Sequence, residues 1–273
     1  MKQILVATDF SNNASNAMEY AMGLAKVLKL EVCAIHAIHP TEGIDNNVFN
    51  AIFIEDYYDK KRTELKDWAA TFSSRDEFKD VPVVTVTGVG FLKNVITRYI
   101  DENHVELLAM GITESTGVSG IVSSNADMLV SLVSIPTLIV PLESKFSYTP
   151  TITLATDFET RFSADDVNTI NDLLHSFKAE KLGVLYVTEK SDAKHIEVGE
   201  SRLKELIKDT PLEFNYIDNS SPLNGIMDFI EKNETDILCL VKRHHNVIYR
   251  LFNRDTVHKV MNRAAKAVLV LHE

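Results

Sequence analysis

Two short polar segments that directly follow apolar runs contain side chains suited to binding a ligand. Thr8, Asp9 and Phe10 follow the apolar residues 4–7, and the same triplet recurs at residues 156–158. The threonine hydroxyl can donate and accept hydrogen bonds, and the aspartate carboxylate can accept them. Asp9 and Glu114 could share a cleft for acid–base chemistry. An aspartate at the end of a strand is also common as a ligand-orienting residue, so no catalytic residue is predicted.

Residues 111–125 form a second segment with binding potential, and its residue types suit an anion. Glycines permit close approach of the backbone to a phosphate, and hydroxyl and amide side chains offer hydrogen-bond donors. Glu114, in contrast, would face a triphosphate unfavourably. Residues 242–255 of the second half contain no glycine, so no phosphate cradle of main-chain amides is expected there. The candidate binding residues within residues 111–125 are Gly111, Gly117, Ser123, Ser124 and Asn125.

The histidines and cysteines lack the spacing of a metal site. Structural zinc ligands usually come in pairs such as C-x2-C or H-x3-H, and neither pair occurs, so no metal ligand is predicted. G-x-S-x-G, P-loop and G-x-G-x-x-G motifs are also missing, and a dedicated enzyme is therefore not the favoured interpretation. His36 and His39 are interpreted as lining a polar crevice. The residues weighed as metal ligands are Cys239, His244, His245, His258 and His272.

An internal repeat sets the domain organisation. Residues 4–10 (ILVATDF) recur as residues 152–158 (ITLATDF), and residues 99–110 match residues 229–240. The offset falls from 148 to 130, so the second copy is 18 residues shorter, and the missing length corresponds to residues 41–79 of the first copy. Such self-similarity indicates a tandem duplication. We predict two domains, residues 1–146 and 147–273, joined through the polar segment 142–150.

Each copy is predicted to be a doubly wound α/β unit of about five parallel strands. Short apolar runs without alternation, such as residues 4–7 and 107–110, are typical of strands covered on both faces. Segments with helical spacing, such as residues 11–26 and 91–103, lie between these runs. Ligands of such folds bind at the carboxyl ends of the strands. The residues expected there are Thr8, Asp9, Phe10, His36, Ala37 and the segment 111–125.

The first copy carries a longer apolar and aromatic segment at residues 48–58. It could cap the crevice or cover a partner surface, but the favoured interpretation is an amphipathic helix that continues through Leu65 and Trp68 and packs on the sheet.

Composition excludes several classes of protein. The chain has 273 residues and a formal net charge of −11, from 39 acidic and 28 basic residues. This balance argues against a general nucleic-acid binder and against attraction to anionic membrane surfaces. No apolar run approaches the roughly 20 residues of a membrane span. The two cysteines, Cys33 and Cys239, lie inside apolar runs, where small buried thiols in a reducing compartment are expected, and we predict a cytoplasmic protein.

The sequence resembles the universal stress protein superfamily in its tandem two-domain form. The resemblance is carried by a first strand ending at Thr8 and Asp9, a second ending at Ala37, and residues 110–117 with residues 123–125 after the fourth strand. In nucleotide-binding members the loop reads G-x2-G-x9-G-[ST]. Gly111 matches the first glycine, whereas Glu114 stands at the second. Ser124 stands at the third, or Ser123 if the loop is one residue shorter.

The resemblance implies a Rossmann-like fold of the adenine nucleotide alpha-hydrolase type and a stress-response binding or sensing module. By matching position, Asp9 and Ala37 would hold adenosine, so an adenine nucleotide (ATP, ADP or AMP) is the expected ligand of the first domain. The alternative is an interaction or scaffold protein of the same fold without nucleotide, and a weak ATPase is a third possibility. The resemblance also implies pairing of residues 137–140 with residues 268–271 in an internal pseudo-dimer, and a homo-oligomer stays open.

Overall fold

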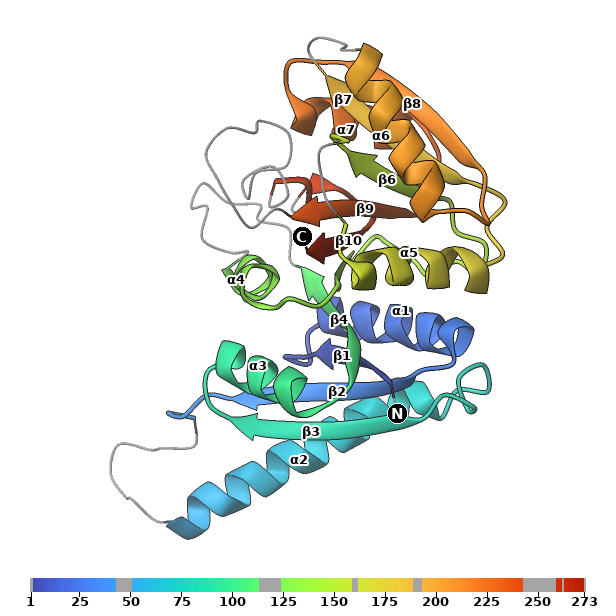
Figure 1. The fold of residues 1–273 in the computed structure, drawn as a ribbon. Helices are drawn as coiled ribbons and strands as arrows, with labels where there is room; N and C mark the ends of the chain where they lie inside the picture. Colours follow the sequence, from blue (N-terminus) through green and yellow to red (C-terminus); the bar gives the residue numbers. More distant parts are fainter. Residues whose placement is uncertain are drawn as a thin grey trace.

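A single ten-stranded sheet runs through the whole computed structural model, with helices on both faces (Figure 1). The structure describes residues 2–42, 51–112, 124–158, 162–188, 193–242, 259–261 and 263–272. The strands of the first half are β1 (Gln3–Ala7), β2 (Glu31–Ile38), β3 (Val83–Val89), β4 (Val105–Ile112) and β5 (Thr137–Pro141). Those of the second half are β6 (Ile152–Thr156), β7 (Leu182–Thr188), β8 (Leu212–Asp218), β9 (Ile237–Lys242) and β10 (Ala267–His272).

The helices alternate with the strands along the chain. The first half contains α1 (Asn12–Leu28), α2 (Ala51–Ser73), α3 (Leu92–Glu102) and α4 (Ser124–Leu132). The second half contains α5 (Ala164–Ser176), α6 (Ala193–Leu206) and α7 (Pro222–Lys232). Ser11 caps α1 by accepting a hydrogen bond from the Ala14 amide, and Ser163 forms a capping box with Asp166 at the start of α5.

The strand order is the same in both halves, which confirms the predicted fold class. The order β3-β2-β1-β4-β5 in the first half is mirrored by β8-β7-β6-β9-β10 in the second, and all pairs within each half are parallel. The halves meet where β5 and β10 pair antiparallel, with Leu138 opposite Leu269. This pairing covers the two strand edges that the resemblance singled out. The domain boundary at residue 146 stays a prediction.

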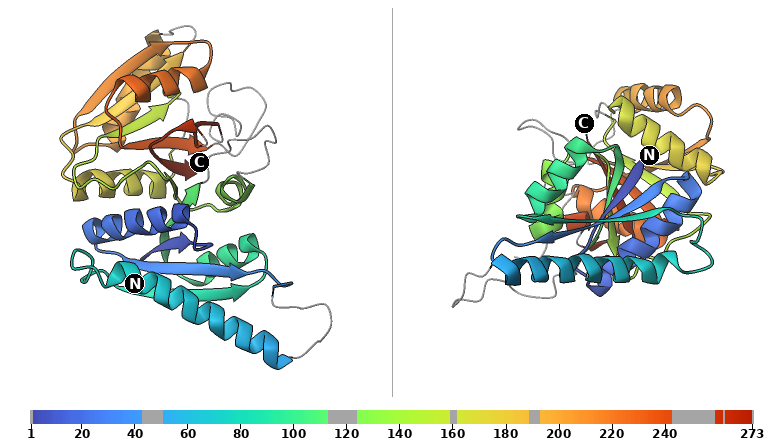
Figure 2. Two further views of the ribbon diagram at one scale, coloured as in Figure 1. Left: turned by 180° about the vertical axis from the view of Figure 1, so that it is seen from behind. Right: turned by 90° about the horizontal axis from the view of Figure 1, so that it is seen from below.

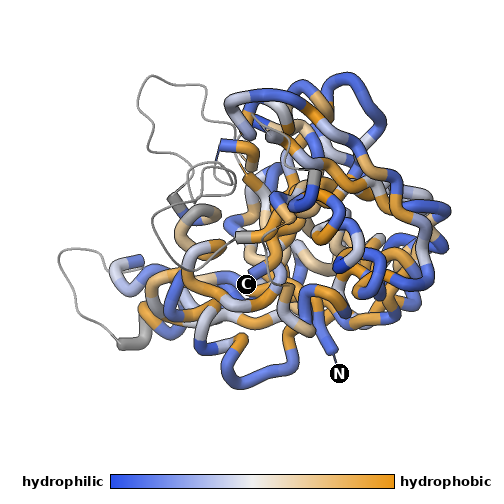
Figure 3. Tube along the Cα trace, turned by 45° about the horizontal axis from the view of Figure 1, so that its top comes forward, coloured by the Kyte–Doolittle hydropathy of each residue, from blue (hydrophilic) through white to orange (hydrophobic). Residues whose placement is uncertain are grey.

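Two apolar clusters, one on each face of the sheet, extend across the junction of the halves. One joins the sheet to α1, α2 and α5, and the other joins it to α3, α4 and α7. Along the junction α1 lies beside α5, as Figures 1 and 2 show. Figure 3 shows hydrophobic segments through the middle of the molecule and hydrophilic segments at its periphery. The sheet is therefore a common core for both halves.

The longer segment of the first copy forms α2, in agreement with the favoured interpretation. Residues 48–50 lie outside the described residues, and the helix begins at Ala51. Leu65 is fully buried, and Trp68 packs against the same apolar cluster. α2 contacts β2 and β3, so it covers one face of the sheet.

Candidate functional site

A cleft of about 540 Å³ lies at the carboxyl ends of β1, β2 and β4. This is where ligands bind in doubly wound sheets. Of the predicted residues, five line the cleft: Thr8, Asp9, Ala37, Gly111 and Asn125. Ser124 is the first residue of α4, whereas Gly117, Ser123 and Glu114 lie outside the described residues. The described part of the chain thus brings together predicted residues from four different segments.

The triplet after β1 forms a tight turn that points Asp9 outward. Thr8 is buried, and its hydroxyl oxygen accepts a hydrogen bond from the Phe10 amide at 2.9 Å. Phe10 has a φ of 65°, an uncommon left-handed conformation for such a bulky residue. Asp9 is exposed, and its Oδ1 accepts a hydrogen bond from the Ser11 amide at 3.0 Å. The second carboxylate oxygen of Asp9 can therefore meet a ligand.

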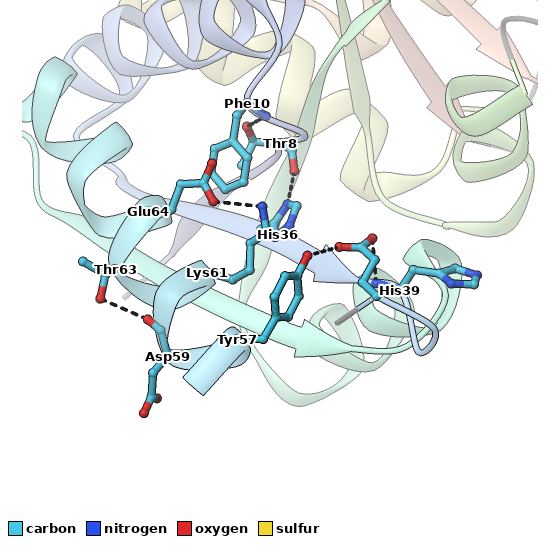
Figure 4. Close-up of polar contacts among 10 residues, drawn as sticks. Thr8, Phe10, His36, His39, Tyr57, Asp59, Lys61, Thr63 and Glu64 are labelled. Atoms are coloured by element: carbon cyan, nitrogen blue, oxygen red, sulfur yellow. Dashed lines mark hydrogen bonds and ion pairs between the residues drawn. The ribbon is translucent and has the colours of Figure 1, made fainter. Parts of the chain in front are cut away.

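Phe10 supports the cleft from behind and does not belong to its wall. Its ring packs against His36, with 4.5 Å between centroids (Figure 4). The same ring packs edge-on against Trp68. His36 lines the cleft, as expected for a polar crevice, and its Nδ1 lies 2.8 Å from the Thr8 carbonyl oxygen. Because a carbonyl oxygen only accepts, Nδ1 carries the proton. Phe10 therefore packs behind the wall of the cleft, and its contact with a ligand stays a prediction.

Gly111 has a structural reason to be glycine. A Cβ atom at this position would lie 2.3 Å from the main-chain oxygen of Asn13 and 2.9 Å from the Ala14 nitrogen. The end of β4 therefore packs directly against the first turn of α1. The glycine brings the start of α1 to the edge of the cleft, where Ser11 and Asn13 become lining residues.

Part of the wall comes from residues that the sequence analysis did not select. The turn between β3 and α3 contributes Gly90 and Phe91, the first turn of α3 contributes Lys93, and the segment after β2 contributes Glu42. These residues follow strands that neighbour one another in the sheet. This position could have indicated that they line the cleft, because the carboxyl ends of parallel strands lie at one edge of the sheet. Lys93 thus adds a positive charge to a wall that also contains the carboxylates of Asp9 and Glu42.

Glu42 is held in place by α2. Its Oε2 accepts a hydrogen bond from the Tyr57 hydroxyl at 2.9 Å, and its Oε1 accepts one from the His39 amide at 3.2 Å (Figure 4). Burial and the hydrogen bond to Glu42 raise the pKa of Tyr57 above its usual value. The tyrosine therefore stays neutral and remains a donor to Glu42.

The equivalent place in the second half is packed differently. The turn is the same, since the Phe158 amide donates to Thr156 Oγ1 at 3.1 Å and Phe158 has a φ of 60°. Asp157, however, is only 3% exposed. The Phe158 ring stacks on Tyr186 at 4.8 Å, and a Cβ on Gly199 of α6 would lie 2.3 Å from it. Residues 243–255 of the loop without glycine lie outside the described residues.

The described residues contain neither a metal-binding cluster nor a membrane-spanning helix. No group of three or more histidine, cysteine, aspartate or glutamate side chains there is arranged to hold a metal ion. No helix in the same residues has the length and apolar character needed to cross a membrane. Cys33 and Cys239 are both buried and unpaired.

Comparison with known proteins identifies the family. The family model described as "Universal stress protein family" matches residues 1–141. A universal stress protein from Archaeoglobus fulgidus DSM 4304 matches 99% of this chain and 98% of its own, with a TM-score of 0.75 and 16% identity. The match with a putative universal stress protein from Pseudomonas aeruginosa UCBPP-PA14 covers 100% of this chain and 93% of that chain, with a TM-score of 0.62 and 15% identity. No curated protein matches the chain. The two structures share the fold of this chain, and the family match over its first half shows that the chain belongs to the universal stress protein family.

Proposed function

We propose that the chain is a cytoplasmic stress-response binding module whose first half holds an adenine nucleotide in the cleft after β1, β2 and β4. The observation that carries this proposal is the contrast between the two copies of the same turn. Asp9 is exposed in a cleft of about 540 Å³, whereas Asp157 is buried beside stacked aromatic rings. A carboxylate that can reach a ligand is therefore present in the first half.

The lining residues suit the parts of a nucleotide. The free oxygen of Asp9 can accept hydrogen bonds from ribose hydroxyls or from an exocyclic amine, and main-chain groups at Ala37 can bind the edge of a base. Asn125 in the first turn of α4 and Lys93 at the start of α3 line the same cleft. An amide side chain and a lysine are suitable donors for a phosphate.

The charge of the cleft favours a ligand with few phosphates. Among the described lining residues, two carboxylates, Asp9 and Glu42, accompany one lysine, Lys93, and no arginine. Each added phosphate raises the repulsion from these carboxylates. We therefore expect AMP to bind at least as tightly as ATP, with ADP between them.

Isothermal titration calorimetry of the purified full chain with AMP, ADP and ATP tests the proposal. Asp9→Asn keeps the size of the side chain and removes its charge, and we expect it to weaken AMP binding at least about tenfold, since a charged hydrogen-bond partner is lost. The matched control is Asp101→Asn, an exposed aspartate at the far end of α3, which should leave the affinity unchanged.

Two outcomes would count against nucleotide binding. Absence of heat for all three nucleotides would favour the alternative of an interaction protein without nucleotide. Equal loss of affinity in both variants would show that the effect of Asp9 is not specific to the cleft. Release of phosphate above a protein-free control, lost in Asp9→Asn, would instead support a weak ATPase.

A further inference from the structure

The repeat makes α1 and α5 equivalent helices, and their contact can be compared position by position. Both helices end in the same way, with the Leu30 amide bonded to the Ala25 carbonyl and the Ala179 amide bonded to the Leu174 carbonyl. The offset is 149 in both cases. By this offset Tyr20 corresponds to Thr169, Gly23 to Asp172 and Leu28 to Phe177. These pairs lie on opposite sides of the α1–α5 contact.

One side of this contact is filled by the linker that joins β5 to β6. The Phe146 ring lies 5.4 Å from the Tyr20 ring and 6.0 Å from the Phe177 ring. It also covers Gly23, where a Cβ atom would approach the ring to 2.4 Å. An aromatic side chain therefore occupies the space between the two helices at this point.

Polar contacts fix the linker beside the ring. Asn16 Nδ2 donates to the carbonyl oxygens of Pro141 and Ser144 at 2.8 and 2.9 Å. The amide oxygen of the same asparagine accepts a hydrogen bond from Lys145 Nζ at 2.9 Å. In the linker a basic residue, Lys145, directly precedes an aromatic one, Phe146. Asn16 of α1 binds the basic side chain, and the apolar space between the two helices holds the ring.

The other side of the α1–α5 contact is an open groove. Two adjoining cavities of about 230 and 520 Å³ share Lys2, Glu106, Thr169 and Asp172 in their walls. The positions equivalent to Tyr20, Gly23 and Phe177, namely Thr169, Asp172 and Leu28, all line the smaller cavity. Its remaining floor is apolar and includes Leu24, Leu30, Leu107, Leu138 and Leu173. The groove is therefore the unfilled counterpart of the Phe146 site.

The groove is more acidic than its filled counterpart. Asp172 replaces a glycine, Asp165 stands at the position of Asn16, and Asp166 follows it at the start of α5. Asp166 is buried and its Oδ1 accepts a hydrogen bond from the His272 amide, but Asp165 and Asp172 are exposed. Lys2 lies 3.1 Å from Glu106, so this base already has an acidic neighbour. The exposed carboxylates complement a positively charged ligand.

We propose that this groove, lined by α1, α5 and the starts of β4 and β5, binds an extended peptide segment of a partner protein in which a basic residue directly precedes an aromatic one. The aromatic ring occupies the apolar part of the cavity beside Leu24, Leu30 and Leu173. It does not lie over Asp172 as Phe146 lies over Gly23, because only a glycine leaves room for a ring there. The basic side chain meets Asp165 or Asp172. The site is at the junction of the halves and separate from the nucleotide cleft, so its test does not depend on the proposed function.

The linker itself supplies a probe. A peptide of residues 142–150 (LESKFSYTP), blocked at both ends and labelled with a fluorophore, is titrated with the full chain and followed by fluorescence anisotropy. We expect saturable binding that weakens at least about tenfold when the phenylalanine of the peptide is replaced by alanine, because a buried aromatic anchor is lost. Asp172→Arg in the protein should weaken binding by a similar factor. Asp228→Arg, an exposed aspartate on α7, is the matched control and should bind as the wild type does.

Several results would overturn the proposal. One is the absence of saturable binding at protein concentrations up to about 1 mM, the weak limit of specific recognition. Another is binding that Asp172→Arg leaves intact and Asn16→Ala weakens, because the peptide would then be replacing the native linker. A third is a dimer in analytical ultracentrifugation that Asp172→Arg dissociates, because a second copy of the chain would then cover the groove. Circular dichroism melting checks that each variant is folded.

Discussion

Replacing Gly111 by alanine separates two explanations for a glycine at the end of β4. In one, the glycine exists so that a phosphate can approach the backbone. In the other, which the structure supports, it lets β4 contact the first turn of α1. The two explanations differ for the protein without ligand. Only the second predicts that Gly111→Ala destabilises the unliganded chain.

The size of the effect follows from the distances. The new Cβ atom would lie 2.3 Å from the Asn13 oxygen and 2.4 Å from the Asn13 carbonyl carbon. Ordinary contacts between such atoms need roughly 3.4 Å or more, so the start of α1 has to move by about 1 Å. Overpacking usually costs about 1 to 3 kcal/mol, and a clash with main-chain atoms belongs at the upper end, near 3 kcal/mol. At roughly 2 to 4 °C per kcal/mol, Tm should fall by about 6 to 12 °C.

The assay is thermal and urea unfolding of the unliganded protein, followed by circular dichroism. Gly183→Ala in β7 is the control, since the nearest atom to its new Cβ is the hydroxyl oxygen of Thr153 at 3.2 Å, which belongs to a side chain. We expect a change in stability below about 1 kcal/mol for this variant. A Gly111→Ala protein that melts within about 2 °C of the wild type would refute the packing explanation.

Two further predictions concern stability and reactivity. Burial raises the pKa of the Cys33 thiol to about 11 and that of Cys239 to about 12, so neither thiol should react with Ellman's reagent at pH 8 in the folded protein, whereas both should react in urea. Rapid modification of the folded protein would contradict this burial. Phe146→Ala should lower the free energy of unfolding by about 2 kcal/mol, less than for a fully buried phenylalanine because the ring is partly exposed. Denaturant unfolding measures it, and a loss no larger than that of Tyr148→Ala, whose side chain is half exposed, would contradict the proposed packing between α1 and α5.

The fold could be predicted because its signals are local and repeated. Unbroken apolar runs and helical spacing fixed the α/β class, and the recurrence of ILVATDF showed that the same topology occurs twice. The antiparallel pairing of β5 with β10 could not be predicted from these signals. Both strands are fully buried, and burial alone does not indicate which strand each one pairs with. The family resemblance supplied that expectation.

The site could be predicted only in part, for geometric reasons. Thr8, Asp9, Ala37 and Gly111 were predicted in the cleft because they lie at the carboxyl ends of β1, β2 and β4, which neighbour one another in the sheet. Glu42 and Lys93 were missed because their presence in the wall depends on the path of the chain after β2 and β3. Phe146 was missed for another reason. It lies in a polar linker, where composition suggested a boundary, yet its ring packs between two helices.

The contrast between the two halves shows why a shared motif does not define a shared site. Thr8 to Phe10 and Thr156 to Phe158 form the same turn with the same hydrogen bond and the same left-handed phenylalanine. The exposure of the aspartate differs because the surroundings differ. In the second half a tyrosine stands where the first has His36, and α6 approaches closely enough that Gly199 contacts the Phe158 ring. The exposure of the aspartate at this turn therefore depends on residues distant in the sequence, and at the α1–α5 contact Phe146 fills one side and leaves the other side open.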